Sequence, residues 1–159
     1  MLFNSTLFLT LFLPVCLAGF FVLGARSRLA AAWWLVLASL VFYAGWSWRY
    51  VPLLLGSVCL NFLCGTRITA LNAAGRKAGA KRLLGAAVVV NLLVLGYYKY
   101  SNFFIENLNA ITGSGIGAFH VILPLGISFF TFTQIAFLVD AYRSEASEPR
   151  FAHYLLFVT

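Results

Sequence analysis

Four polar side chains stand inside long apolar stretches of this sequence, and they are its first candidates for chemistry. They are Asn61, Asn91, Ser128 and Gln134. An amide or hydroxyl without a partner is costly in hydrocarbon, so each should face a protein interior or a wet cavity. Each side chain either bonds to a neighbouring helix, at about 0.6 kcal/mol on average, or contacts a substrate. Both interpretations stay open, and the stretch that holds Ser128 and Gln134 is the richer one.

Three further polar residues, Asp140, Tyr142 and Arg143, close that same stretch. A carboxylate near the carboxyl end of a helix is disfavoured by the helix dipole, so Asp140 should have a specific partner. Arg143 or a basic residue of another loop could provide it. We expect a buried or half-buried ion pair of Asp140 that fixes the mouth of a cavity.

The sequence lacks the common catalytic and metal-binding motifs. It has no GxSxG, no HExxH and no set of Cys and His residues at ligand spacing. His120 and His153 are its two histidines, and each is interpreted as interfacial or hydrogen-bonded rather than as a base. Cys59 and Cys64 lie roughly 140° apart around a helix, a poor geometry for sharing a metal ion. No metal site is predicted.

Composition sets the class of protein that must position these residues. Hydrophobic residues make up 62% of the chain and charged residues 9%, and the mean hydropathy is +0.94. Soluble domains carry about 25% charged residues, so a soluble fold is excluded. The net charge of +7 lies in short breaks between apolar runs. It therefore indicates membrane topology, and no nucleic-acid partner is expected.

The apolar runs predict an all-α membrane protein with five transmembrane helices, at residues 7–23, 29–46, 51–66, 83–98 and 119–139. The third and fourth runs are short, at about 24 Å each, for a hydrocarbon core of about 30 Å. Residues 101–112 have an apolar stripe that predicts an additional helix lying in the membrane interface. A further apolar segment begins after Pro149. We therefore expect residues 1–159 to be part of a single, larger membrane domain.

Lysine and arginine are distributed unevenly over the connections between these helices. If all five crossings exist, one side of the membrane holds Arg26, Arg28, Arg67, Arg76, Lys77, Lys81, Arg82, Arg143 and Arg150, and the other holds Arg49 and Lys99. Positive residues gather in the cytoplasm, so the loop at residues 67–82 is expected there and the amino terminus outside. Two aromatic clusters, at residues 43–50 and 97–100, fall on the same predicted outer face.

One segment resembles a known family. The block LPLGISFFTFTQIAFLVDAYR, residues 123–143, is similar to the membrane-bound O-acyltransferase family, and to its alginate O-acetyltransferase-like branch in particular. The opening MLFNSTLFLTLFLPV, the VFYAGW segment at residues 41–46 and GYYKYSNFFIENLN at residues 96–109 resemble that branch in the same order. The similarity covers almost the whole chain, which would correspond to the amino-terminal portion of a protein of this family.

The resemblance implies a larger helical enzyme of a bacterial inner membrane that moves an acyl group from a thioester to a hydroxyl. The donor would be acetyl-CoA or an acyl-carrier thioester, and the acceptor an exported polysaccharide such as alginate. Partners would be a periplasmic or extracellular acetyltransferase and polysaccharide export machinery. The family's essential histidine would lie beyond Thr159, so this chain alone is expected to be inactive. The competing interpretation is a complete small transporter subunit or membrane assembly factor.

Overall fold

The computed structural model of the chain describes residue 6 and residues 8–112, 123–143 and 151–159, and these are helical apart from short turns. Its elements are the π-helical turn η1 (Phe8–Phe12), α1 (Leu13–Gly24), α2 (Arg28–Ser47), the 3₁₀ turn η2 (Trp48–Tyr50), α3 (Val51–Ala73), α4 (Lys77–Thr112), α5 (Ile127–Arg143) and α6 (Phe151–Val158). The predicted all-α class is confirmed.

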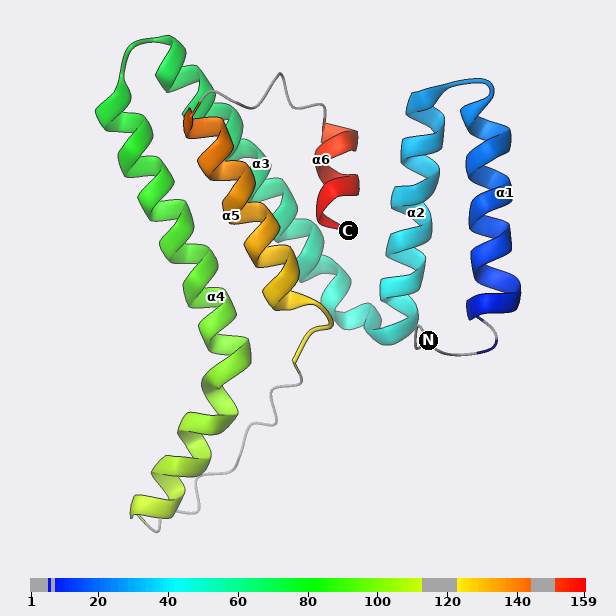
Figure 1. Cartoon of the computed structure of the whole chain (residues 1–159). Coiled ribbons are helices and arrows are strands. Elements are labelled where there is room, and N and C mark those ends of the chain that lie inside the picture. The colour runs from blue at the N-terminus through cyan, green and yellow to red at the C-terminus, as the bar shows by residue number, and fades with distance from the viewer. Residues whose placement is uncertain (1–5, 7, 113–122, 144–150) are drawn as a thin grey trace.

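The helices run alternately up and down, and Figure 1 shows the α1–α2 connection, the α3–α4 connection and the end of α5 at one end of the molecule. Tight turns make these reversals possible. Ser27 accepts a hydrogen bond from the Ala30 amide at 3.4 Å and caps α2, while Gly75 adopts φ 73° in the α3–α4 connection. The basic connections expected to share one side of the membrane are therefore at the same end.

Within the described part of the chain, three helices are long and apolar enough to cross a membrane: α2, α3 together with η2, and α4. The apolar helix at residues 8–24 is shorter, and α5 has 17 residues. The helices α3 and α4 exceed the predicted runs, because α3 has 23 residues and α4 has 36. At 1.5 Å per residue these lengths are roughly 35 Å and 54 Å, so no thinning of the bilayer is needed for either.

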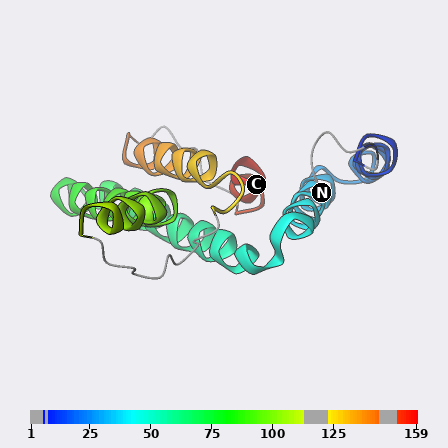
Figure 2. The same cartoon turned by 90° about the horizontal axis from the view of Figure 1, so that it is seen from below.

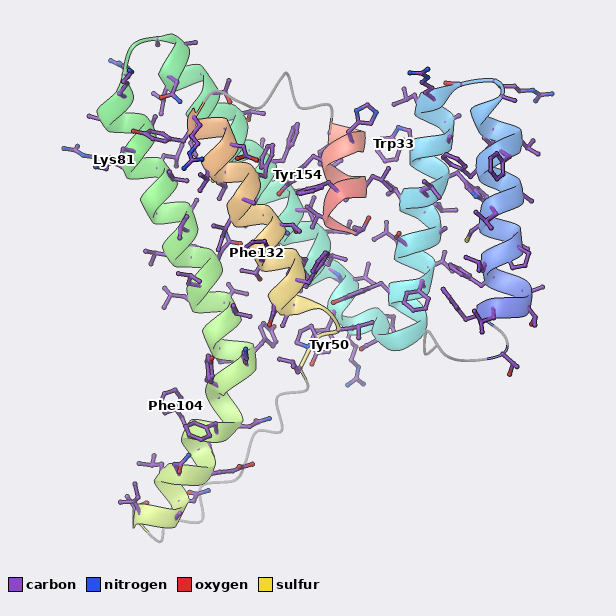
Figure 3. The ribbon with its side chains drawn as sticks, viewed as in Figure 1. Trp33, Tyr50, Lys81, Phe104, Phe132 and Tyr154 are labelled. Atoms are coloured by element: carbon purple, nitrogen blue, oxygen red, sulfur yellow. The ribbon has the colours of Figure 1, made fainter. Side chains whose placement is uncertain are left out.

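The segment at residues 101–112 is helical, but it is not a separate helix as the sequence pattern predicted. It continues α4 without interruption to Thr112. Side chains in this segment also bond to the backbone of the same helix; for example, Asn107 Nδ2 donates to the Phe103 carbonyl at 2.7 Å. Figure 3 shows Phe104 on the part of α4 that extends past the other helices.

Two groups of helices are joined by α6. The first group is α3, α4 and α5, and the second is the α1–α2 hairpin. Figure 2 shows α6 between α5 and α2, and it contacts both of them as well as α3. Within the hairpin, a Cβ at Gly19 would lie 2.3 Å from the Trp34 ring. Trp34 donates its indole N–H to the Cys16 carbonyl at 3.0 Å, so glycine permits this close approach.

An aromatic cluster of Phe62, Phe137, Phe151 and Tyr154 ties α6 to the larger group. The Phe137 and Tyr154 ring centroids are 4.2 Å apart, and Phe62 stacks on Phe137 at 6.4 Å. Figure 3 shows Tyr154 on the side of α6 that faces α3 and α5. At the opposite end from the basic connections, Tyr50 and Tyr98 meet edge to face at 6.0 Å. The two aromatic regions predicted to share a face therefore touch.

Candidate intramembrane polar site

The centre of the candidate site is a pair of side-chain amides on facing helices. Asn61 of α3 donates its Nδ2 to Asn91 Oδ1 at 3.1 Å, and Asn91 of α4 donates its Nδ2 to Asn61 Oδ1 at 2.7 Å. Each amide also bonds within its own helix, Asn61 Nδ2 to the Ser57 carbonyl at 2.9 Å and Asn91 Nδ2 to the Ala87 carbonyl at 2.8 Å. Both side chains are buried, so the pair locks α3 to α4 in one register.

Gln134 of α5 extends this pair to a third helix. Its Oε1 accepts from the Ser57 hydroxyl at 2.6 Å and lies 2.7 Å from Asn61 Nδ2, whose two hydrogens are shared among the Ser57 carbonyl, Asn91 Oδ1 and Gln134 Oε1. Gln134 is completely buried, and Ser57 lies one turn before Asn61 on the same face of α3. Three of the four polar residues singled out from the sequence, Asn61, Asn91 and Gln134, therefore form one cluster, which we call the amide cluster together with Ser57.

The amide cluster lies between two apolar cores. One core includes Val58 and Phe130, and the other includes Ile68 and Leu138, so apolar side chains flank Asn61 and Gln134 along their helices. A groove of about 460 Å³ opens between α3 and α4, and its lining includes Ser57, Asn61, Asn91 and Thr131. The cluster holds neutral hydrogen-bonding groups only. It can bind or orient a polar group, but it supplies no acid or base.

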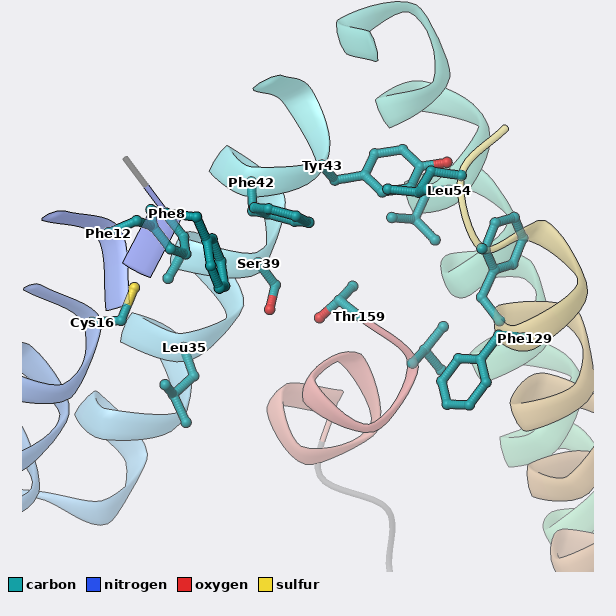
Figure 4. Close-up of a pocket in the computed structure, with 15 residues that line it drawn as sticks. Phe8, Phe12, Cys16, Leu35, Ser39, Phe42, Tyr43, Leu54, Phe129 and Thr159 are labelled. Carbon is teal, nitrogen blue, oxygen red and sulfur yellow. The ribbon is translucent and has the colours of Figure 1, made fainter. Parts of the chain in front are cut away.

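A second cavity, of about 520 Å³, lies between the α1–α2 hairpin, α5 and the end of α6 (Figure 4). We call it the aromatic pocket, because its lining includes Phe8, Phe12, Phe42, Tyr43, Phe129 and Phe130, with Ser39 and Thr159 as polar groups. These residues come from η1, the second half of α2, the beginning of α5 and the position that follows α6. The pocket therefore lies toward the end of the molecule away from the basic connections (Figure 1).

The turn before α5 shapes one wall of this pocket. Gly126 adopts φ 68°, a conformation that disfavours other residues, and its carbonyl accepts from the Phe130 amide at 2.9 Å. The chain thereby turns into α5 with Phe129 and Phe130 at the pocket. This turn gives a structural reason for the LPLG sequence that opens the family-like block.

Ser128 and Asp140 do not join the amide cluster. Ser128 is exposed near the start of α5, and Asp140 is exposed near its end. The expected burial of Asp140 is wrong in this structure, because position 140 lies on the face of α5 away from its buried residues. Arg143 is exposed and Tyr142 is half-buried. Asp140 forms no ion pair with any other described side chain.

The end of α5 is held by a residue that the sequence did not indicate. Asn72 of α3 donates its Nδ2 to the Tyr142 carbonyl at 2.7 Å. The last carbonyls of a helix lack partners within it, so this bond satisfies one of them. Ser57 was also missed. Its spacing of four residues from Asn61 was the available signal, since such residues share a helix face.

His153 does not line either of the two described cavities. His153 is exposed on α6, and His120 lies outside the described residues. The three cysteines are free thiols. What the fold and site define is thus a helical membrane protein with a neutral polar site between its helices and an aromatic pocket at one end.

Curated relatives are similar to this chain over most of its length. A peptidoglycan O-acetyltransferase of Helicobacter pylori is 45% identical over 94% of this chain, which covers 28% of that protein. Proteins named probable alginate O-acetylase AlgI are 44% identical in Pseudomonas aeruginosa, over 91% of this chain and 28% of theirs, and 42% identical in Azotobacter vinelandii, over 94% and 30%. No family model matches, and no solved structure matches.

This chain is therefore homologous to a segment of the O-acetyltransferases of the membrane-bound O-acyltransferase family. The resemblance stated from residues 123–143 and the shorter segments is confirmed. The chain spans less than a third of the length of these relatives.

Proposed function

We propose that this chain is part of a membrane-bound enzyme that transfers an acyl group, most simply acetyl, to hydroxyl groups of a cell-envelope polysaccharide. The main support is the identity of 38 to 45% with relatives named for O-acetylation of peptidoglycan or alginate. Identity at this level extends over the helices that build both cavities. The acceptor is a glycan of the envelope, with peptidoglycan and alginate as the first two to test.

The part played by this segment is to bind and position substrate rather than to move protons. The amide cluster contains no titratable side chain, and the one described histidine is exposed on α6. Transfer of an acyl group to a hydroxyl requires a base that removes the hydroxyl proton. We place that base in the remaining part of the enzyme, so the segment alone is inactive.

The two ends of the segment suit two different substrates. We place the protein in the bacterial plasma membrane with its amino terminus outside and the loop at residues 67–82 in the cytoplasm. The basic connections share one end (Figure 1), where acetyl-CoA or an acyl-carrier thioester, both anionic, would approach. The aromatic pocket lies toward the other end, where the glycan and an extracytoplasmic acetyltransferase or export partner would be met.

The test is transfer by the purified full-length protein in lipid nanodiscs, supplied with radiolabelled acetyl-CoA or acetyl-carrier protein and with peptidoglycan or alginate oligosaccharides. The proposal expects label to appear as a base-labile ester on the glycan. A transporter subunit or assembly factor would give no ester with any combination of donor and acceptor. A cell-based comparison of glycan O-acetyl content with and without the gene provides the matching measurement in the native membrane.

A further inference from the structure

The groove of about 460 Å³ between α3 and α4 belongs to the part of the chain that would meet lipid. Apart from Thr131, its lining residues lie within Trp48–Ala73 and Lys77–Thr112, two of the segments long and apolar enough to cross a membrane. Leu60 and Val90 of this lining are 61% and 54% exposed. In a bilayer such side chains contact hydrocarbon, so the groove opens toward the acyl chains of the membrane.

A small residue leaves free space along the groove. Gly56 of α3 lines it, and no atom beyond the adjacent residues and the helix's own nearby backbone lies within 4 Å of a Cβ built there. The lining of α3 runs from Pro52 to Cys64, which is about 18 Å at 1.5 Å per residue. One leaflet takes up about 15 Å, half of the hydrocarbon core. The length of the groove therefore suits one extended acyl chain.

Two arginines stand at one end of the groove. The lining of α3 stops at Cys64, three residues before Arg67, and Arg82 lies four residues before Ala86 of the α4 lining. Residues three or four apart share a helix face, so Arg67 and Arg82 lie on the faces that form the groove. Both are exposed, and neither forms an ion pair with another described side chain. Two uncompensated positive charges therefore stand at the end of the groove nearer the basic connections.

We propose that this groove binds one acyl chain of an anionic phospholipid and that Arg67 and Arg82 hold the phosphate of its head group. The site is independent of the enzymatic activity proposed above. Guanidinium groups donate to phosphate oxygens in pairs, and their apolar stems can lie along the hydrocarbon boundary. Basic pockets between transmembrane helices bind lipid head groups by this chemistry. The apolar lining and the paired charges thus match the two ends of one lipid molecule.

A helix from the remainder of the enzyme fits this groove less well than a lipid chain. A helix with its side chains is about 10–12 Å across. Asn61 and Asn91 line the groove and donate to each other across it, so α3 and α4 are in direct contact there. The space between them is a furrow along two touching helices, and an acyl chain is narrow enough to follow it.

Photolabelling of the full-length protein tests the site directly. The protein is placed in phosphatidylcholine nanodiscs that contain a small share of phosphatidylglycerol with a diazirine near the methyl end of one acyl chain. After illumination, mass spectrometry of peptides should find the label within residues 52–64 and 83–94, severalfold more than with phosphatidylcholine that carries the same diazirine chain. Equal labelling by the two lipids, or no label in these two ranges, would overturn the proposal.

A matched pair of double variants tests the head-group contacts. Arg67→Gln with Arg82→Gln should lower labelling by phosphatidylglycerol severalfold. Lys77→Gln with Lys81→Gln removes the same charge from α4, but these lysines lie on the stripe that continues to Gly85, which does not line the groove. This second variant should label like the unmodified protein. Equal losses in the two double variants would reduce the effect to net charge and contradict a site at the arginines.

Filling the groove tests the acyl-chain contacts separately. Gly56→Leu places a branched side chain in the free space of the groove, so labelling from the methyl end of the chain should fall severalfold. Gly85→Leu is the control, since that position is equally open but lies outside the groove, and its labelling should not change. Equal labelling of the two leucine variants would contradict an acyl chain in the groove.

Competition with coenzyme A separates a lipid from the acyl donor. Both carry phosphate groups that the two arginines could bind, but coenzyme A has no acyl chain to fill the groove. An excess of coenzyme A should therefore leave labelling by phosphatidylglycerol unchanged. Loss of the label on addition of coenzyme A would assign Arg67 and Arg82 to the donor and overturn the lipid site.

Discussion

The side-chain amides of Asn61 and Asn91 donate to each other across the α3–α4 interface, at 3.1 and 2.7 Å. A reciprocal pair satisfies one donor and one acceptor on each side, and Gln134 then attaches α5 through Asn61. Three helices thus depend on one connected set of neutral side chains. Removing any member leaves a buried partner without a hydrogen bond.

Asn91→Leu should therefore destabilise the three-helix group. The change leaves Asn61 Oδ1 without its donor, and we expect the free energy of unfolding to fall by about 1–2 kcal/mol. Titration of the purified chain from mild detergent into dodecyl sulfate measures this quantity by circular dichroism. Val89→Leu is the matched control on the same helix, since Val89 is 54% exposed and should change stability little.

Coupling within the pair provides the sharper form of this prediction. Combining Asn61→Leu with Asn91→Leu removes both amides, so the double variant should lose less free energy of unfolding than the two single losses together. Additive losses would show that the two amides act independently, contrary to the reciprocal bond.

Gly65→Ala should loosen the contact between α3 and α5. A Cβ at position 65 would lie 2.4 Å from Phe137 Cε1, and Phe137 has little freedom to move because Phe62 and Tyr154 pack against its ring. The expected loss is about 1–3 kcal/mol of unfolding free energy in the same titration. Adding Phe137→Leu should recover part of it.

The control for that variant is Gly85→Ala in α4, where no atom beyond the adjacent residues and the helix's own nearby backbone lies within 4 Å of the added Cβ. Alanine favours a helix over glycine by about 0.5–1 kcal/mol, so this variant should be at least as stable as the unmodified chain. If Gly65→Ala and Gly85→Ala changed the free energy of unfolding equally, the close approach of Gly65 and Phe137 in the structure would be incorrect.

Asn72→Ala should fray the end of α5. Without the bond to the Tyr142 carbonyl, backbone amides in the last turn should exchange with deuterium several-fold faster, at a cost of about 0.5–1.5 kcal/mol. Asp140→Asn should leave exchange there unchanged, because Asp140 is exposed. Faster exchange in Asp140→Asn than in Asn72→Ala would instead support the ion pair of Asp140 that the sequence predicted.

The membrane orientation is testable with single cysteines. In a background without Cys16, Cys59 and Cys64, Arg49→Cys and Arg76→Cys place thiols at exposed positions on the two ends. A membrane-impermeant maleimide added to intact spheroplasts should label position 49, and position 76 only after lysis. The reverse pattern would place the basic loop outside.

The sequence predicted the helices well where apolar runs were long, and it predicted the amide cluster only in part. Asn61, Asn91 and Gln134 were recognisable because an amide in hydrocarbon needs a partner. Which partners meet depends on helix rotation, and this left Ser128 and Asp140 on the exposed side of α5. The extension of α4 to Thr112 was missed because polar residues such as Asn102 and Glu106 end the apolar run without ending the helix.

The aromatic pocket could not be anticipated for a related reason. Its walls come from α1, α2, α3, α5 and α6, so no local pattern contains it. Its position toward the end away from the basic connections is nevertheless what assigns it to the acceptor side in the proposed reaction.

Filling this pocket tests the account most directly. The full-length protein carrying Ser39→Trp, which places an indole at the pocket wall, is compared with Leu37→Trp, whose position is 57% exposed on the same helix. The measurement is O-acetyl ester on the envelope glycan per molecule of membrane-inserted protein. We expect Ser39→Trp to lower it by about tenfold or more and Leu37→Trp to leave it unchanged. Equal ester content in the two variants would contradict the pocket's role in acyl transfer.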